Sequence, residues 1–147
     1  MSAAVKPMNK FDFLTGKWKL TYDVPESEFS RMDGGTGKGE IKKILNDQFV
    51  LFDYSAELGT GKTAARGIFR YDDKTDIYRY QWFEDSGAFM EASCGFTEEN
   101  ILRLNWHNSI LVQTFYKEDS GNIILRMNSP EGDAGYKTIL KVTLEKI

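Results

Sequence analysis

Apolar and polar side chains alternate along most of this chain, and that pattern constrains its fold more than any other feature. Residues 18–24 read W-K-L-T-Y-D-V, with an apolar side chain at every second position. Residues 136–145 repeat the pattern up to Leu144. Successive residues of a strand face opposite sides, so strict alternation is typical of strands with one face on a core.

Turn-forming residues separate the alternating segments. Glycine, asparagine, aspartate and serine gather at 46–47, 59–61, 72–76, 85–87, 97–100, 107–108, 119–122 and 130–133. Short strands separated by such turns at a spacing of about 8–12 residues are typical of an antiparallel all-β domain. We expect about ten strands. Only Asn9 to Leu14 reads as a helical turn, and no stretch is long enough for a crossover helix.

A meander of about ten strands leaves two unpaired edges unless it closes on itself. The sequence therefore predicts an antiparallel up-and-down barrel, with a two-sheet sandwich as the alternative. We expect a flexible N-terminus over residues 1–10 and a single barrel domain over residues 11–147. The glycine-rich stretch 27–39 is expected to be a long mobile loop that leads into the second strand.

Charge and composition exclude several classes of partner. The net charge is −3, and acidic and basic residues are interleaved, so neither nucleic acid nor a membrane surface is expected as a partner. No apolar run approaches the roughly 20 residues of a membrane helix, and the first residues lack the apolar segment of a secretory signal. Cys94 is the only cysteine, which favours a cytoplasmic protein. A secreted protein whose signal had been removed would look the same.

Residues 56–63, A-E-L-G-T-G-K-T, match a permissive form of the phosphate-binding loop of nucleotide-hydrolysing enzymes. Such a loop needs a helix after it, because the helix N-terminus faces the phosphates. Here only about eight residues precede the next turn, and Phe69 and Tyr71 alternate as in a strand. We therefore interpret the segment as a hairpin, in which Gly59 and Gly61 supply positive φ angles.

No set of residues indicates catalysis or metal binding. A single histidine, His107, falls in a predicted turn, and Cys94 alternates with apolar residues as a buried side chain would. Asp72, Asp73 and Asp76 lack the terminal glutamate of a calcium loop. We expect no catalytic residues, no metal and no cofactor.

The aromatic residues are more informative, because many share the apolar side of their strands. They are Tyr22, Tyr54, Tyr78, Tyr80, Tyr136, Trp18, Trp82 and Trp106. A buried phenol needs a hydrogen-bond partner, so these hydroxyls either bond to neighbouring strands and reach the rims, or point into a central cavity. A barrel of more than eight strands tends to leave interior room. Arg126 has apolar residues on both sides; pointing inward, it would anchor an anionic group.

Three motifs resemble those of lipocalin-like (calycin) barrels, in particular a family of uncharacterised, mostly bacterial domains. They are F-L-x-G-x-W at 13–18, G-x-x-x-Y-D at 67–72 and Y-x-x-x-W at 78–82. The resemblance spans residues 11–147 and implies the barrel fold with a pocket inside. It carries over no activity. The T-D-Y motif and the C-terminal helix of secreted lipocalins are missing, as is the late histidine of haem-binding relatives.

Three hypotheses of function follow. The first is binding of a small hydrophobic or amphipathic ligand inside the barrel. Its expected site residues are Tyr54, Phe69, Tyr78, Tyr80, Trp82, Met90, Leu104, Trp106 and Arg126. The second is an enzyme, either an isomerase or a haem-dependent detoxifying barrel acting through His107. The third is a filled barrel that serves as an interaction module or homodimer, which an interior without a cavity above about 300 Å³ would favour.

Overall fold

A computed structural model describes residues 6–24, 34–59, 61–130 and 135–147. They form one 3₁₀ helix and ten β-strands, which confirms the all-β class and the expected number of strands. In chain order the elements are η1 (Pro7–Leu14), β1 (Gly16–Asp23), β2 (Gly35–Ile44), β3 (Phe49–Leu58), β4 (Gly61–Asp72), β5 (Ile77–Glu84), β6 (Phe89–Glu98), β7 (Ile101–Trp106), β8 (Val112–Lys117), β9 (Ile123–Pro130) and β10 (Tyr136–Lys146).

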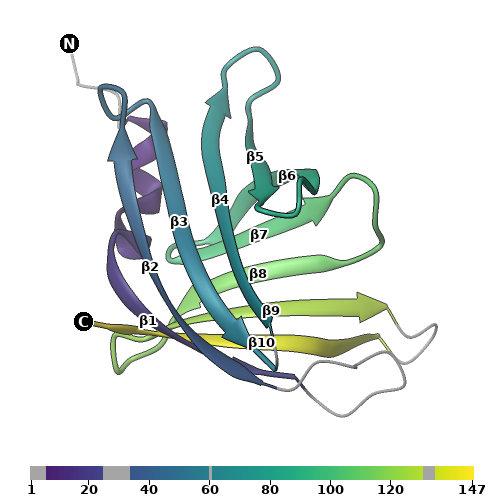
Figure 1. The fold of residues 1–147 in the computed structure, drawn as a ribbon. Coiled ribbons are helices and arrows are strands. Elements are labelled where there is room, and N and C mark those ends of the chain that lie inside the picture. Colours follow the sequence, from purple (N-terminus) through teal and green to yellow (C-terminus); the bar gives the residue numbers. More distant parts are fainter. Residues whose placement is uncertain (1–5, 25–33, 60, 131–134) are drawn as a thin grey trace.

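The strands close into a single barrel (Figure 1). Each strand pairs antiparallel with the next one in sequence, and β1 also pairs with β10, where Tyr22 lies opposite Val142. The predicted up-and-down barrel is thereby confirmed over the two-sheet sandwich. Closure gives every edge strand a partner, so no row of backbone groups is left open along a sheet edge.

The alternation in the sequence corresponds to the two faces of the barrel wall. In β7, Leu102, Leu104 and Trp106 are buried, while Arg103 and Asn105 between them are more exposed. The inward side chains of all strands meet in one apolar core. The sequence pattern therefore identified the inner face of most strands, although not of β2 or β9. Tyr136 of β10, expected on the apolar side, is 57% exposed.

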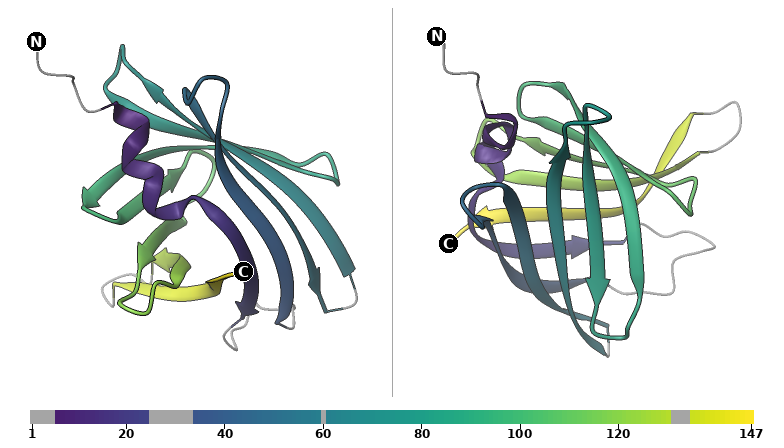
Figure 2. Two further views of the ribbon diagram at one scale, coloured as in Figure 1. Left: turned by 90° about the vertical axis from the view of Figure 1, so that its left-hand side faces the viewer. Right: turned by 90° about the horizontal axis from the view of Figure 1, so that it is seen from above.

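Helix η1 covers one end of the barrel (Figure 2). Phe11 is fully buried and its ring centroid lies 5.3 Å from that of Tyr78 and 5.0 Å from that of Phe96. The Tyr78 hydroxyl donates to the carbonyl of Pro7 at 2.8 Å. The Nε1–H of Trp18 donates to the carbonyl of Leu14 at 2.9 Å. The helix is thus fixed to the barrel at both of its ends.

This helix begins earlier than the sequence indicated. It starts at Pro7, with Met8 buried, whereas the expected turn began at Asn9. Residues 7–10, expected to be flexible, belong to it, and residues 1–5 lie outside the described residues. Proline fits the first position of a helix because it lacks only an N–H that would be unpaired there.

Strand β2 begins earlier than the sequence indicates. The sequence predicts that residues 35–39 belong to the mobile loop, but they are part of β2 and pair with both β1 and β3. The inner positions of this segment are Gly35, Gly37 and Gly39. A Cβ on Gly37 would stand 2.3 Å from the carbonyl oxygen of Ser55. Glycine is needed for this close approach, and without side chains the segment shows no alternation in the sequence.

The hairpin interpretation of residues 56–63 is confirmed. Strand β3 pairs antiparallel with β4, with Leu58 opposite Gly61, so no helix follows the glycines. Gly59 has the expected positive φ of 57°. Gly61 does not; it is the first residue of β4 in an ordinary strand conformation.

Candidate functional site

A cavity of about 260 Å³ lies inside the barrel, away from η1. Every strand except β2 contributes a side chain to its wall, because the inner positions of β2 beside it are glycines. Leu58, Thr63, Glu84, Met90 and Leu111 line it where their strands end or just beyond. These positions are at the barrel end opposite the helix, so the cavity opens toward the turns at that end.

Five of the nine predicted site residues line this cavity. They are Tyr54, Tyr80, Trp82, Met90 and Trp106. They come from β3, β5, β6 and β7, which are consecutive in the barrel apart from β4. That these residues bind a ligand stays a prediction.

Three other predicted residues are buried outside the cavity wall. Phe69 and Leu104 are fully buried in the core. Tyr78 lies at the helix end, where its hydroxyl bonds to Pro7. Phe69 still supports the site, because its ring stacks on the ring of Tyr80 at 4.1 Å between centroids.

Arg126 is on the outer face. Its neighbours Leu125 and Met127 both line the cavity, and the alternation of β9 turns Arg126 the other way. Its Nε–H donates to the hydroxyl of Tyr116 at 3.2 Å. The arginine therefore does not supply the interior anchor for an anionic group that an inward orientation would have given.

Sequence reasoning missed the polar lining residues Thr63, Glu84 and Gln113. Gln113 is 5% exposed and lies on the inner face of β8, beside the buried Phe115. A glutamine that alternates with apolar residues was the signal available in the sequence. Leu125 and Met127 of β9 were also missed, since apolar residues on both faces hid the direction of that strand.

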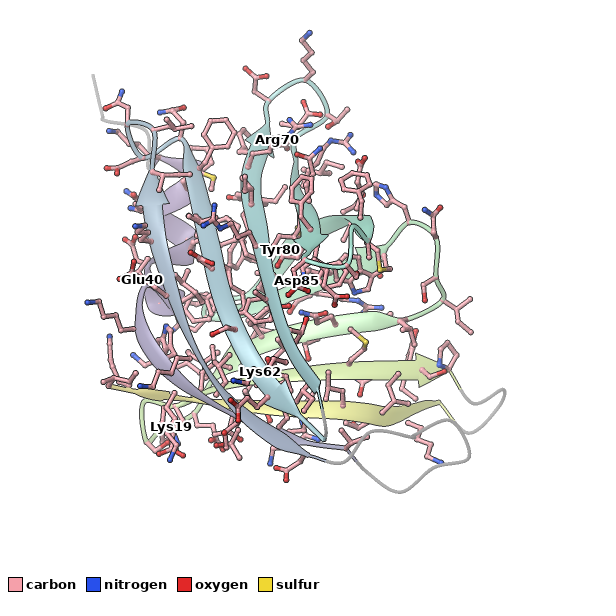
Figure 3. All side chains as sticks on the ribbon, in the orientation of Figure 1. Lys19, Glu40, Lys62, Arg70, Tyr80 and Asp85 are labelled. Carbon is pink, nitrogen blue, oxygen red and sulfur yellow. The ribbon has the colours of Figure 1, made fainter. Side chains whose placement is uncertain are left out.

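Tyr22, Tyr54 and Tyr80 all line the cavity, and Tyr80 is labelled in Figure 3. Tyr54 accepts a hydrogen bond from the Nε1–H of Trp82 at 2.8 Å. Burial is the main cause that raises the pKa of Tyr22 and of Tyr80 above the usual value, and the Tyr54 phenol is the second cause. Burial also raises the pKa of Tyr54. All three phenols therefore stay protonated and neutral at physiological pH.

Glu84 is the only lining residue with a charged side chain; no lysine, arginine or histidine lines the cavity among the described residues. One carboxylate oxygen of Glu84 accepts a hydrogen bond from Ser86 at 2.7 Å. The charged side chains of the outer face, among them Lys19, Glu40 and Lys62 in Figure 3, belong to exposed or half-buried positions. The interior site is thus aromatic and apolar, with one acid where it opens.

The residues considered for other chemistry lie apart from this cavity. His107 is exposed and its Nε2 is 2.7 Å from Ser93 Oγ on the outer face. Cys94 is buried, and burial raises the pKa of its thiol to about 12. Asp72 bonds to Arg79 at 2.9 Å, as a structural ion pair does. Within the described part of the chain, no three metal-ligating side chains are grouped.

Comparison with known proteins adds little. No family model matches the chain, and no curated protein matches it. Among solved structures, 16 chains match. One is a de novo designed fluorescence-activating β-barrel, with 9% sequence identity, a TM-score of 0.45, and coverage of 92% of this chain and 95% of that chain. At that level the likeness carries no argument about function. In the described residues, moreover, no helix has the length and hydropathy to span a membrane.

Proposed function

We propose that this protein is a lipocalin-like barrel that binds a small, largely apolar molecule in its interior. The observation that carries the proposal is the cavity of about 260 Å³, which is walled mainly by aromatic and aliphatic side chains. Apolar surface left uncovered inside a barrel is a favourable place for an apolar ligand, because binding removes both surfaces from water.

The size of the cavity limits the ligand. An apolar cavity of about 150 Å³ is enough for benzene, whereas drug-sized ligands occupy about 300–1,000 Å³. At about 260 Å³ the interior suits one or two fused rings with a small substituent. Tetrapyrroles and retinoids are too large for it without rearrangement of the wall.

A cavity-filling variant tests the proposal. Val142 is buried and lines the cavity, so Val142→Phe places a ring in the ligand's space. Val112 of β8 is half-buried and does not line it, and Val112→Phe is the matched control. We expect naphthalene to quench tryptophan fluorescence in the parent protein and in Val112→Phe, but not in Val142→Phe. Unchanged fluorescence of the parent protein with naphthalene and other small aromatic compounds would contradict ligand binding.

A filled barrel that associates with a second copy is the other candidate. The cavity lies below the limit of about 300 Å³ that separates the two hypotheses. On the outer face, Phe83 and Phe89 are 43% and 49% exposed, with ring centroids 5.2 Å apart. A homodimer would cover this pair. Light scattering after size-exclusion chromatography tests it: a dimer that dissociates in Phe83→Ser would support this candidate, and a monomer at high concentration would eliminate it.

A cytoplasmic location is also a proposal. It is supported by the single cysteine, which is buried in the core as a free thiol.

A further inference from the structure

Several polar groups of the cavity wall have no partner in the protein. Among the described residues, nothing hydrogen-bonds to the hydroxyl of Tyr22, the hydroxyl of Tyr80 or the side-chain amide of Gln113. The side chains of these residues are at least nine-tenths buried, with exposed fractions of 8%, 2% and 5%. A buried polar group without a partner destabilises a fold, so three on one wall need an explanation.

These unpaired groups reach the open space of the cavity. Across the described ranges, only Thr63 Oγ1 and Trp106 Nε1 are both unpaired and completely enclosed by protein atoms. The polar atoms of Tyr22, Tyr80 and Gln113 are therefore unpaired without being completely enclosed. Since all three residues line the cavity, we take the cavity as the space that their polar atoms reach.

All three groups can act as hydrogen-bond donors. Burial raises the pKa of Tyr22 and Tyr80, so both keep the phenolic proton. A protonated phenol can donate one hydrogen bond, and an amide supplies two further N–H groups and one acceptor. Tyr54 adds a third phenolic proton, because its oxygen is already the acceptor for Trp82. The wall therefore holds several O–H and N–H donors that have no acceptor among the described residues, and a ligand that brings an acceptor can pair with them.

The charge of the wall selects against an anion. Glu84 is the only charged side chain that lines the cavity in the described chain. A carboxylate ligand would lose its hydration without meeting a cation, which is unfavourable, and Glu84 would repel it. The acceptor that fits is therefore an uncharged one, such as a carbonyl oxygen or a ring nitrogen.

We infer that the cavity selects an uncharged, ring-bearing molecule with a hydrogen-bond acceptor, which the hydroxyls of Tyr22 and Tyr80 and the amide of Gln113 receive. This inference rests on the proposed function and narrows its ligand to one chemical class. The rings lie against Trp82, Trp106 and Phe52, and the acceptor points to the phenols.

Four probes of one size test the inference. They are naphthalene, with no acceptor, 2-acetylnaphthalene, with a neutral carbonyl, 2-naphthoate, an anion, and 2-naphthylmethylammonium, a cation. Each is titrated into the protein and followed by calorimetry. Tyr80→Phe removes one of the donors from the cavity. Tyr78→Phe is the matched control, because its hydroxyl bonds to Pro7 at the helix end and does not line the cavity.

We expect 2-acetylnaphthalene to bind the parent protein more tightly than either charged probe. Loss of one hydrogen bond corresponds to a factor of about 3–10 in Kd. Tyr80→Phe should therefore raise the Kd of 2-acetylnaphthalene by that factor and leave the Kd of naphthalene within about 2-fold of the parent value. Tyr78→Phe should change neither Kd.

The other outcomes overturn the inference in distinguishable ways. An equal effect of Tyr80→Phe on naphthalene and 2-acetylnaphthalene would mean that the phenol does not receive the carbonyl, while ligand binding itself would stand. Tightest binding of 2-naphthoate or of the ammonium probe would assign the site to an anion or a cation instead. If none of the four probes binds, the proposed function fails, and this inference fails with it.

Discussion

The phenol oxygen of Tyr80 lies directly over the backbone of Gly67 on the neighbouring strand. A Cβ added to Gly67 would stand 1.8 Å from Tyr80 Oη and 2.2 Å from Cζ. Gly67 lies opposite Trp82 in the register of β4 and β5. Tyr80 is therefore a diagonal neighbour of Gly67, and its inward phenol occupies the space that a side chain at Gly67 would fill.

Gly67→Ala should therefore displace Tyr80. Because the ring is packed against Phe69, we expect the free energy of unfolding to fall by about 1–3 kcal/mol, the usual range for overpacking. The measurement is urea denaturation followed by tryptophan fluorescence. Gly95→Ala is the control, since nothing lies within 4 Å of a Cβ there. Equal midpoints for the two variants would contradict the placement of Tyr80.

The hydrogen bond between Trp82 and Tyr54 should be visible in stability. Tyr54→Phe leaves the Trp82 Nε1–H without its acceptor at 2.8 Å, so we expect a loss of about 1 kcal/mol in urea denaturation. Tyr22→Phe removes a hydroxyl that has no partner among the described residues, so it breaks no hydrogen bond and should cause no loss of stability. A larger loss for Tyr22→Phe than for Tyr54→Phe would show that this polar arrangement is wrong.

The ion pair of Asp72 and Arg79 should make stability depend on pH. A hydrogen bond from Arg79 is the main cause that lowers the pKa of Asp72 to about 2, from a usual value of 3.8. The folded protein favours the ionised form of Asp72. Between pH 2 and 3.8, therefore, the unfolded chain binds more protons at this residue than the folded protein does. This stabilisation is complete above about pH 4 and is lost as the pH falls toward 2.

Asp72→Asn tests this dependence by thermal unfolding at pH 7, 4, 3 and 2. The variant should have a lower Tm than the parent at pH 7 and a smaller further loss between pH 4 and 2. Asp53→Asn is the control, because the Asp53–Arg66 pair is longer, at 3.4 Å, and largely exposed. If the Tm of the parent and that of Asp72→Asn fell in parallel as the pH is lowered, Asp72 would not be a cause of the pH dependence.

Cys94 should be unreactive in the folded protein. Burial raises the pKa of its thiol to about 12, and the thiolate is the reactive form. We expect Ellman's reagent at pH 8 to react at least about 100-fold more slowly with the native protein than with the protein in urea. The double variant Ser93→Cys, Cys94→Ser moves the thiol to the outer face and should react without denaturant. Rapid reaction of native Cys94 would place it outside the core.

The fold was largely predictable because strand alternation is a local property of the sequence. Each inward run, such as Leu102, Leu104 and Trp106, appears within a few residues, and closure follows from the need to pair the last edge. Glycines 35, 37 and 39 could not be assigned in the same way. Their role is set by the backbone of β3, which lies against them only in the folded barrel.

The candidate site was predictable only in part, because an inward side chain can end in the core or at the cavity. Tyr78 and Tyr80 share one face of β5, yet Tyr78 reaches Pro7 and Tyr80 reaches the cavity. The difference depends on where η1 lies, and η1 comes from a distant part of the chain. The outward direction of Arg126 likewise follows from Leu125 and Met127 facing the cavity, which the sequence alone does not indicate.

The side-chain indole resonances of the three tryptophans give the most direct test of ligand binding inside the barrel. Trp82 and Trp106 line the cavity, whereas Trp18 lies at the helix end with its N–H on Leu14. In ¹H–¹⁵N spectra, 2-acetylnaphthalene should shift the indole signals of Trp82 and Trp106 and leave that of Trp18 in place. Signals that all stay unchanged at saturating probe, or a shift confined to Trp18, would contradict a ligand site in this cavity.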